Sequence, residues 1–413
     1  MSGVTRPADR SVLRAARKAG DTRRDGRGRV ASMPPILQYG FRPFFFLAAV
    51  YAGIAVPLWL WLYTHGGVLA GPFDGLHWHA HEMVFGYLGA VLAGFILTAI
   101  PNWTGRLPLS GRPLAALVAL WLAGRVAAAF IREPWVAMAV DLAFPLVLAF
   151  AVWREVVAGR NWKNAPIAAM ITLFGAASAL DYLGAMEILP EGLGIRLALG
   201  VGAVLIALVG GRIVPSFTRN WLVKQGATQL PASFGKPDAA AMATTILGAL
   251  AWVVVPDWPG TGVLLVAAGV FLAIRMVRWR GYATTAEPIV LILHLGYAWL
   301  AAALALLGLA VMLPAISEGA ALHALTAGAV GTMTLAVMTR ASLGHTGRPI
   351  VADGSTVGVY ALVTLGALLR VGAPLAGDAY LWVLSLGGFL WSAAFLLFAV
   401  RYAPVLGGRR VGA

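Results

Sequence analysis

The hydrophobic positions of this chain fall into long apolar runs that are separated by short segments rich in Pro, Gly and charge. A helix needs about 20 apolar residues to cross the hydrocarbon core of a bilayer, and twelve runs reach or approach that length. Most of them begin or end at a helix-breaking residue. The pattern therefore predicts twelve membrane-spanning helices, at residues 43–65, 79–101, 114–131, 134–153, 165–186, 195–214, 239–256, 260–277, 288–313, 319–339, 356–376 and 380–401.

Composition supports an all-α polytopic membrane protein. Of the 413 residues, 60% are hydrophobic and only 12% are charged, whereas soluble domains are about 25% charged. The chain has no cysteine, which excludes disulfides and thiolate metal sites. The net charge of +14 does not require a nucleic-acid partner, because membrane proteins collect Lys and Arg in their cytoplasmic loops.

The loop charges orient the predicted bundle. If the N-terminus is cytoplasmic, every cytoplasmic gap between spans is basic, and the opposite gaps hold only Arg132, Arg196 and Arg370. We therefore expect both termini in the cytoplasm and the second span running from the periplasmic side inward. Three segments follow: a basic, disordered cytoplasmic tail at 1–33, a twelve-helix domain at 34–405, and a short cytoplasmic tail at 406–413.

Three of the predicted spans resemble one another. The second, sixth and tenth are Gly-rich, run in the same direction and end in loops that contain Thr, Arg and Pro: NWTGRLP, GGRIVPSFTRNW and TRASLGHTGRP. They lie four helices apart. This spacing predicts a pseudo-threefold repeat of four-helix units.

A histidine cluster opens the second span. His77, His79 and His81 alternate along the chain and Glu82 follows them. If this segment is already helical, His77 and His81 share one face and His79 points away; if it is extended, His77 and His79 share a side. Imidazole binds copper, zinc and haem iron, and Glu82 could be a ligand or accept a hydrogen bond from a ring N–H. The alternative is a polar cap at the membrane interface, anchored by Trp78.

His323 lies early in the tenth span, at a depth similar to that of His81. In a threefold arrangement the two spans could face each other, so that His81 and His323 would form a bis-imidazole pair for a haem. Polar residues inside spans are candidates for function. The alternative for His323 is a hydrogen bond to a neighbouring carbonyl.

Charged residues also lie within the third to fifth spans. Arg125 and Asp141 stand at equal depth in an antiparallel hairpin, so we expect an ion pair, which avoids the cost of an unpaired buried charge. The alternative role for Arg125 is contact with a haem propionate. Asp181 could take a proton or a cation.

The remaining histidines and the methionines are weaker candidates for metal or haem ligands. We expect His294 to be a hydrogen-bonded core residue, His65 to be exposed at the interface, and His345 to make a loop hydrogen bond or an anion contact. Met83, beside the histidines, is the methionine best placed for Cu(I), although methionines in apolar helices are usually core residues.

Four stretches resemble the NnrS family: GFRPFFFLAAVYAGIAVPLWL, WHAHEMVFGYLGAVLAGFILTAIPNWTGR, GGRIVPSFTRNW and ALHALTAGAVGTMTLAVMTRASLGHTGRP. The resemblance covers about residues 40 to 400. It implies twelve helices, bound haem and copper, residence in the bacterial inner membrane, and a role in nitric oxide metabolism or protection from nitrosative stress. It does not assign the ligand residues.

A twelve-helix, pseudo-threefold core with histidines on the outer side is also similar to that of the haem-copper oxidases and nitric oxide reductases. The sixth and seventh spans here carry no histidine, so their three-histidine copper centre is missing. A haem between the second and tenth spans would fit. The copper centre would then be either lost or moved to His77 and His79.

Two functions remain open at this stage. The first is a haem- and copper-binding protein that handles nitric oxide or a related small ligand, or protects cellular iron from it, either by electron transfer with a redox partner or by binding. The second is a twelve-helix transporter of a small solute or metal ion without haem. Transporters place substrate groups near the midplane, whereas the ionisable residues here gather toward the outer third. The sequence shows no clear proton route or open metal position, so it does not decide whether the protein is an enzyme.

Overall fold

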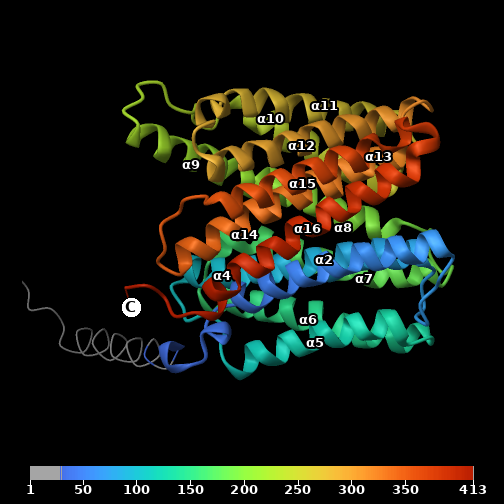
Figure 1. Cartoon of the computed structure of the whole chain (residues 1–413), viewed down its shortest axis with the longest axis horizontal. Helices are drawn as coiled ribbons and strands as arrows, with labels where there is room; N and C mark the ends of the chain where they lie inside the picture. The colour runs from blue at the N-terminus through green and yellow to red at the C-terminus, as the bar shows by residue number, and fades with distance from the viewer. Residues whose placement is uncertain (1–27, 29, 413) are drawn as a thin grey trace, which may run out of the picture.

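The computed structural model describes residue 28 and residues 30–412, which form one bundle of long, roughly parallel helices (Figure 1). Within that part of the chain, twelve helices are long and apolar enough to cross a membrane, as the sequence predicts. In order, the elements that make up the spans are α2 (Phe41–His65), α3 (Gly75–His81), η2 (Glu82–Leu88), α4 (Gly89–Thr104), α5 (Arg112–Phe130), α6 (Pro134–Ala158), α7 (Ala165–Ala185), α8 (Leu193–Leu205), η4 (Ile206–Gly210), α9 (Gly211–Lys224), α10 (Lys236–Val254), α11 (Pro259–Val277), α12 (Pro288–Met312), α13 (Glu318–His323), η6 (Ala324–Val330), α14 (Gly331–His345), α15 (Gly354–Gly372) and α16 (Tyr380–Gly407).

The sixth span is longer than its apolar run. The hydrophobic pattern ends near Val214, but α9 continues through Pro215 to Lys224. Val214, Thr218 and Leu222 are buried at four-residue spacing, so the extension is amphipathic and keeps one face on the bundle. Its other face is polar, so residues 215–224 interrupt the apolar run. For this reason the hydrophobic pattern predicts that the span ends at residue 214.

The second and tenth spans lie at the centre of the bundle. In their most apolar stretches, 78% and 72% of the residues are buried, against 33% for α10 at the periphery. The second span packs against α2 and α6, while the tenth packs against α12 and α15. Most residues on these two spans therefore face other helices, and buried polar groups there need partners within the protein.

The second, sixth and tenth spans share an irregularity. Each contains a π-helical segment, η2, η4 and η6 respectively. A π-helical turn disturbs the regular carbonyl pairing, and a side chain from a neighbouring helix donates to a carbonyl in each segment. Trp121 Nε1 donates to Gly86 O at 2.9 Å, Arg275 donates to Ala207 O at 3.0 Å, and Trp391 Nε1 donates to Ala327 O at 3.2 Å, so the three spans of the predicted repeat have a common design.

The two ends of the bundle differ in charge. The gaps after the even-numbered spans share one end with residues 35–40 and 408–412, on the left in Figure 1. We call this the basic end, because nearly all described Lys and Arg outside the spans lie there. The opposite end holds Arg132, and Arg196 and Arg370 lie in their spans near that end. The predicted tail at 1–33 lies almost wholly outside the described residues, and residues 30–32 of it are helical.

Candidate functional site

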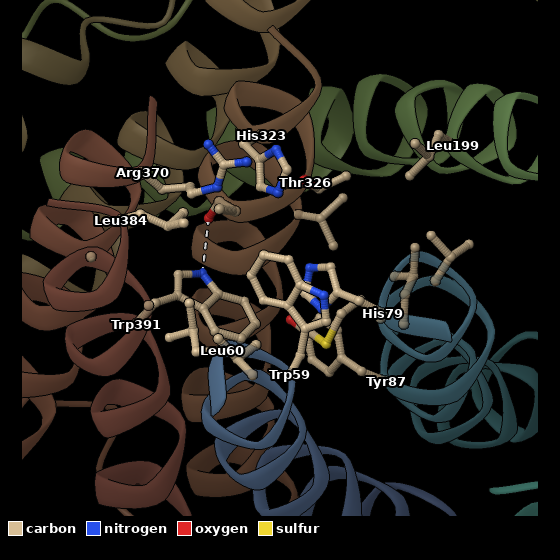
Figure 2. A pocket seen from close by; sticks show the side chains of 18 residues that line it. Trp59, Leu60, His79, Tyr87, Leu199, His323, Thr326, Arg370, Leu384 and Trp391 are labelled. Atoms are coloured by element: carbon tan, nitrogen blue, oxygen red, sulfur yellow. Dashed lines mark hydrogen bonds between the residues drawn. The ribbon is translucent and has the colours of Figure 1, made fainter. Parts of the chain in front are cut away.

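A cavity lies between the second and tenth spans (Figure 2). It is near the end of the bundle opposite to the basic end, because α3 and α13, which begin these spans, carry its histidines. Helices α2, α8, α15 and α16 complete its wall. Its volume is about 80 Å³, which is enough for a few molecules the size of water. Apart from two histidines and Arg370 the wall is largely apolar and aromatic, with Trp59, Tyr87 and Trp391 among its residues.

His79 enters the cavity from α3. Its imidazole stacks on the indole of Trp59, with ring centroids 4.2 Å apart and an angle of 22° between the planes. Its Nδ1 is buried and has no hydrogen-bond partner. Buried polar atoms without a partner are uncommon and call for an explanation. Met83, one helical turn further on, lines the same cavity.

His323 enters the cavity from the end of α13 on the tenth span. Its Nδ1 lies 2.7 Å from the carbonyl oxygen of Gly319, one turn earlier. A carbonyl can only accept, so Nδ1 carries the proton and Nε2 keeps its lone pair. Fixing the tautomer through a backbone carbonyl is the usual arrangement for a histidine that offers its other nitrogen to a metal.

Arg370 brings a positive charge to the cavity from α15. Its side chain projects toward His323 in Figure 2, and its Nε is buried without a partner. No ion pair with a described residue neutralises this guanidinium. The cavity thus combines two imidazoles, an unpaired cation and apolar walls.

The other face of the second span is a charged network. His77 Nε2 lies 3.1 Å from Asp181 Oδ1, and His81 Nδ1 lies 2.8 Å from Asp181 Oδ2. His81 Nε2 lies 3.0 Å from Asp141 Oδ2. Because both of its nitrogens meet carboxylates, His81 has no free ring nitrogen for a ligand. A doubly protonated ring satisfies both carboxylates.

Arg125 completes this network and confirms the predicted ion pair. One guanidinium nitrogen donates to Asp141, and the other donates to Glu82 at 2.5 Å. Tyr51 OH also donates to Glu82. All three charged side chains are buried, and their mutual pairing avoids the several kcal/mol that an unpaired buried charge costs. Arg125 is thereby held on the network, away from the cavity.

The structure changes the predicted assignment within the cluster. Helix α3 begins at Gly75, so the helical alternative applies: His77 and His81 share a face and His79 points away. His79, and not His81, lies in the cavity with His323. His81 and His323 do occupy matching places, since each is the last residue before a π-helical segment. The carboxylates of α6 and α7 nevertheless engage His81.

The predicted metal set is divided between these two environments. His77, His81 and Glu82 belong to the network, and His79 and His323 belong to the cavity. Among the described residues, no three His, Asp or Glu side chains are arranged to hold one metal ion. The donor set of the cavity is instead two imidazoles without a carboxylate, and imidazole is a ligand that haem iron and copper both accept.

The other histidines lie elsewhere. His294 is buried and pairs with the hydroxyl of Thr218 at 2.8 Å, as expected for a core histidine. His65 is exposed and bonds to the carbonyl oxygen of Trp61. His345 ends α14 at the basic end, where its ring packs against Phe41.

Sequence reasoning missed Trp59, Arg370 and Trp391 as parts of the site. Arg370 had a usable signal, since it is one of three basic residues on its side of the predicted membrane. The pairing of His81 with carboxylates also had a signal in the sequence. The second to fifth spans bury the acids Glu82, Asp141 and Asp181 against a single arginine, so charge balance requires a further cation. The packing of the two tryptophans has no local sequence signal.

Comparison with known proteins agrees with this architecture. A family model described as NnrS protein matches residues 35–410, which is nearly all of the described chain. A search of curated proteins finds no match. The family match confirms the resemblance carried by the four stretches, two of which supply His79 and His323. The chain belongs to the NnrS family.

Proposed function

We propose that this protein holds a haem between His79 and His323 and acts in nitric oxide metabolism or protection from nitrosative stress. The observation that carries the proposal is the tautomer of His323. Its Nδ1–H is bound to the carbonyl oxygen of Gly319, which leaves Nε2 free in a cavity that a second, unpaired imidazole also enters. Family membership supports the role in nitric oxide metabolism.

The residues of the cavity fit a haem in chemistry. Apolar and aromatic walls suit the porphyrin faces, and the guanidinium of Arg370 would pair with a propionate. The volume of about 80 Å³ is smaller than a haem, so binding requires side chains to move. Met83 is the wall residue best able to do so, because its unbranched side chain adapts readily.

A bound haem would supply an iron that binds small ligands and exchanges electrons. The chain's own contribution would be two histidines that are anchored unequally. His323 is fixed by its hydrogen bond, whereas His79 is held only by stacking on Trp59. A haem bound there would thus be held more firmly by His323 than by His79. The largely apolar wall would offer water few hydrogen-bond partners beside His79.

The predicted copper site does not fit as well. His77 is bound to Asp181 and stacks on Phe73, with ring centroids 4.7 Å apart, while His79 lies on the opposite face of the helix. The two cannot share one ion without rebuilding α3. Copper remains an implication of the family resemblance, and the proposed role of the cavity does not depend on it.

The proposed setting is the bacterial inner membrane, with the basic end in the cytoplasm. The concentration of Lys and Arg at one end of the bundle supports this orientation. The cavity would then lie toward the periplasmic side, and an electron donor would have to reach it from there or through the bundle.

The test is an optical one. The full chain is purified from cells supplied with haem, its reduced-minus-oxidised spectrum and haem content are measured, and nitric oxide is then added to the reduced protein. We expect a six-coordinate haem whose spectrum changes with nitric oxide. A colourless protein would overturn the proposal and favour the transporter. A haem whose spectrum does not change when nitric oxide is added would contradict the role in nitric oxide metabolism.

A further inference from the structure

A second, larger cavity lies at the basic end of the bundle. Its volume is about 510 Å³, within the range of about 300–1,000 Å³ that is usual for ligand sites. Helices α4, α9 and α14 form its walls, and Phe41 and Phe45 of α2 contribute to them. It therefore lies among the same three repeated spans as the histidine cavity, at their other end.

The interior and the mouth of this cavity differ. Phe95, Ile213 and Val337 make its walls apolar. The lining residues Arg212 and His345 are exposed, which places the mouth at the basic end. A molecule that fills this space would need an apolar body and a head group that faces the mouth.

The charge at the mouth is positive and unpaired. Arg212 and Arg340 line the cavity, and neither makes an ion pair with a described residue. Arg340 instead lies over the ring of Phe217, 3.7 Å from its centroid. Some arginines at this end are paired, for example Arg275 with Asp238 at 2.8 Å, whereas Arg212 and Arg340 differ from other unpaired ones such as Arg219 in lining the cavity. Unpaired charges at the ends of spans are candidates for ligand binding.

We propose that this cavity binds an anionic lipid, with the acyl chain between α4, α9 and α14 and the phosphate or carboxylate held by Arg212 and Arg340. Charge complementarity and the apolar interior both favour such a ligand, and basic pockets between spans are known to bind lipid head groups. The proposal assigns a role to the GGRIVPSF and TRASLGH stretches, which the histidine cavity does not use. It is independent of the haem.

Trp103 offers a direct measurement, because its indole lines this cavity. The full chain is placed in phosphatidylcholine nanodiscs and titrated with dibromostearate, brominated phosphatidylglycerol or brominated phosphatidylcholine, while tryptophan fluorescence is recorded. Bromine quenches only nearby indoles. The Trp103→Phe variant isolates the signal of the cavity.

We expect saturable quenching by the anionic probes and little by brominated phosphatidylcholine. Arg212→Gln and Arg340→Gln should each raise the half-quenching concentration roughly tenfold, as the loss of one charge-assisted contact implies. Val337→Phe, which fills the cavity, should also weaken binding. Arg219→Gln is the matched control, because Arg219 is exposed on the same helix outside the cavity.

The two anionic probes distinguish the source of the ligand: a response to dibromostearate alone identifies a free fatty acid, and a response to brominated phosphatidylglycerol identifies a membrane lipid. Equal quenching by phosphatidylcholine would overturn the proposal. So would an equal effect of Arg219→Gln, or quenching that Trp103→Phe leaves unchanged.

Discussion

The two faces of the second span show how one short segment gives histidines opposite roles. On one face, His81 is held by two carboxylates and is buried completely. On the other face, two residues away, His79 has no hydrogen bond on Nδ1 and lies beside a cavity. Both rings are imidazoles inside a membrane protein. What separates them is whether the neighbouring helices already satisfy their nitrogens, so a histidine becomes a ligand candidate when its surroundings leave a nitrogen free.

The largest effect, on haem binding, is expected for the two histidines that line the cavity. His323→Ala should remove essentially all bound haem, because it deletes the anchored ligand. His79→Ala should retain a larger share and yield a five-coordinate haem that binds carbon monoxide faster than the wild type. Haem content and carbon monoxide binding measure both effects. His65→Ala, at an exposed histidine, should change neither. If His65→Ala loses as much haem as His323→Ala, the assignment fails.

The second-largest effect is expected for the charged network around His81 and Arg125. Arg125→Met leaves Glu82 and Asp141 buried without their cation, which should lower the free energy of unfolding by about 3–5 kcal/mol. Adding Asp141→Asn to this variant should recover part of the loss, because one uncompensated charge is then removed. Chemical unfolding in detergent measures both. A loss below about 1 kcal/mol for Arg125→Met would show that the network is solvated and contributes little.

A smaller effect is expected for the cation in the cavity. Arg370→Gln should weaken haem retention about tenfold, as expected for one charge-assisted contact. Its effect on stability should be small, because Arg370 makes no ion pair with a described residue. Haem transfer to apomyoglobin compares the variant with the wild type. Unchanged transfer would remove Arg370 from the site.

The smallest effect tests the π-helical segments. Trp391→Phe removes the hydrogen bond to Ala327 O and keeps most of the ring packing, so it should cost about 1 kcal/mol. Trp121→Phe, which removes the equivalent bond to Gly86 O, should cost a similar amount. Thermal unfolding of the two variants measures this. A large difference between them would contradict the common design of the second and tenth spans.

The pattern of apolar runs was sufficient to predict the twelve spans, since crossing a bilayer leaves a signal of length and composition in each segment. It also predicted the pairing of Arg125 with Asp141, because a short loop fixes the relative depth of α5 and α6. It could not decide between His79 and His81 as the partner of His323. That choice depends on which face of α3 meets α6 and α7, and therefore on packing between helices that are distant in the chain.

The most direct test of the central claim replaces the less anchored ligand by a free one. His79→Gly is purified with haem, and its spectrum is recorded while imidazole is added. We predict that imidazole enters the vacated space and restores the six-coordinate spectrum of the wild type, while His81→Gly, if it folds, shows a six-coordinate haem without imidazole. The account is contradicted if His79→Gly is already six-coordinate and His81→Gly needs imidazole. His81, in the charged network, would then be the haem ligand.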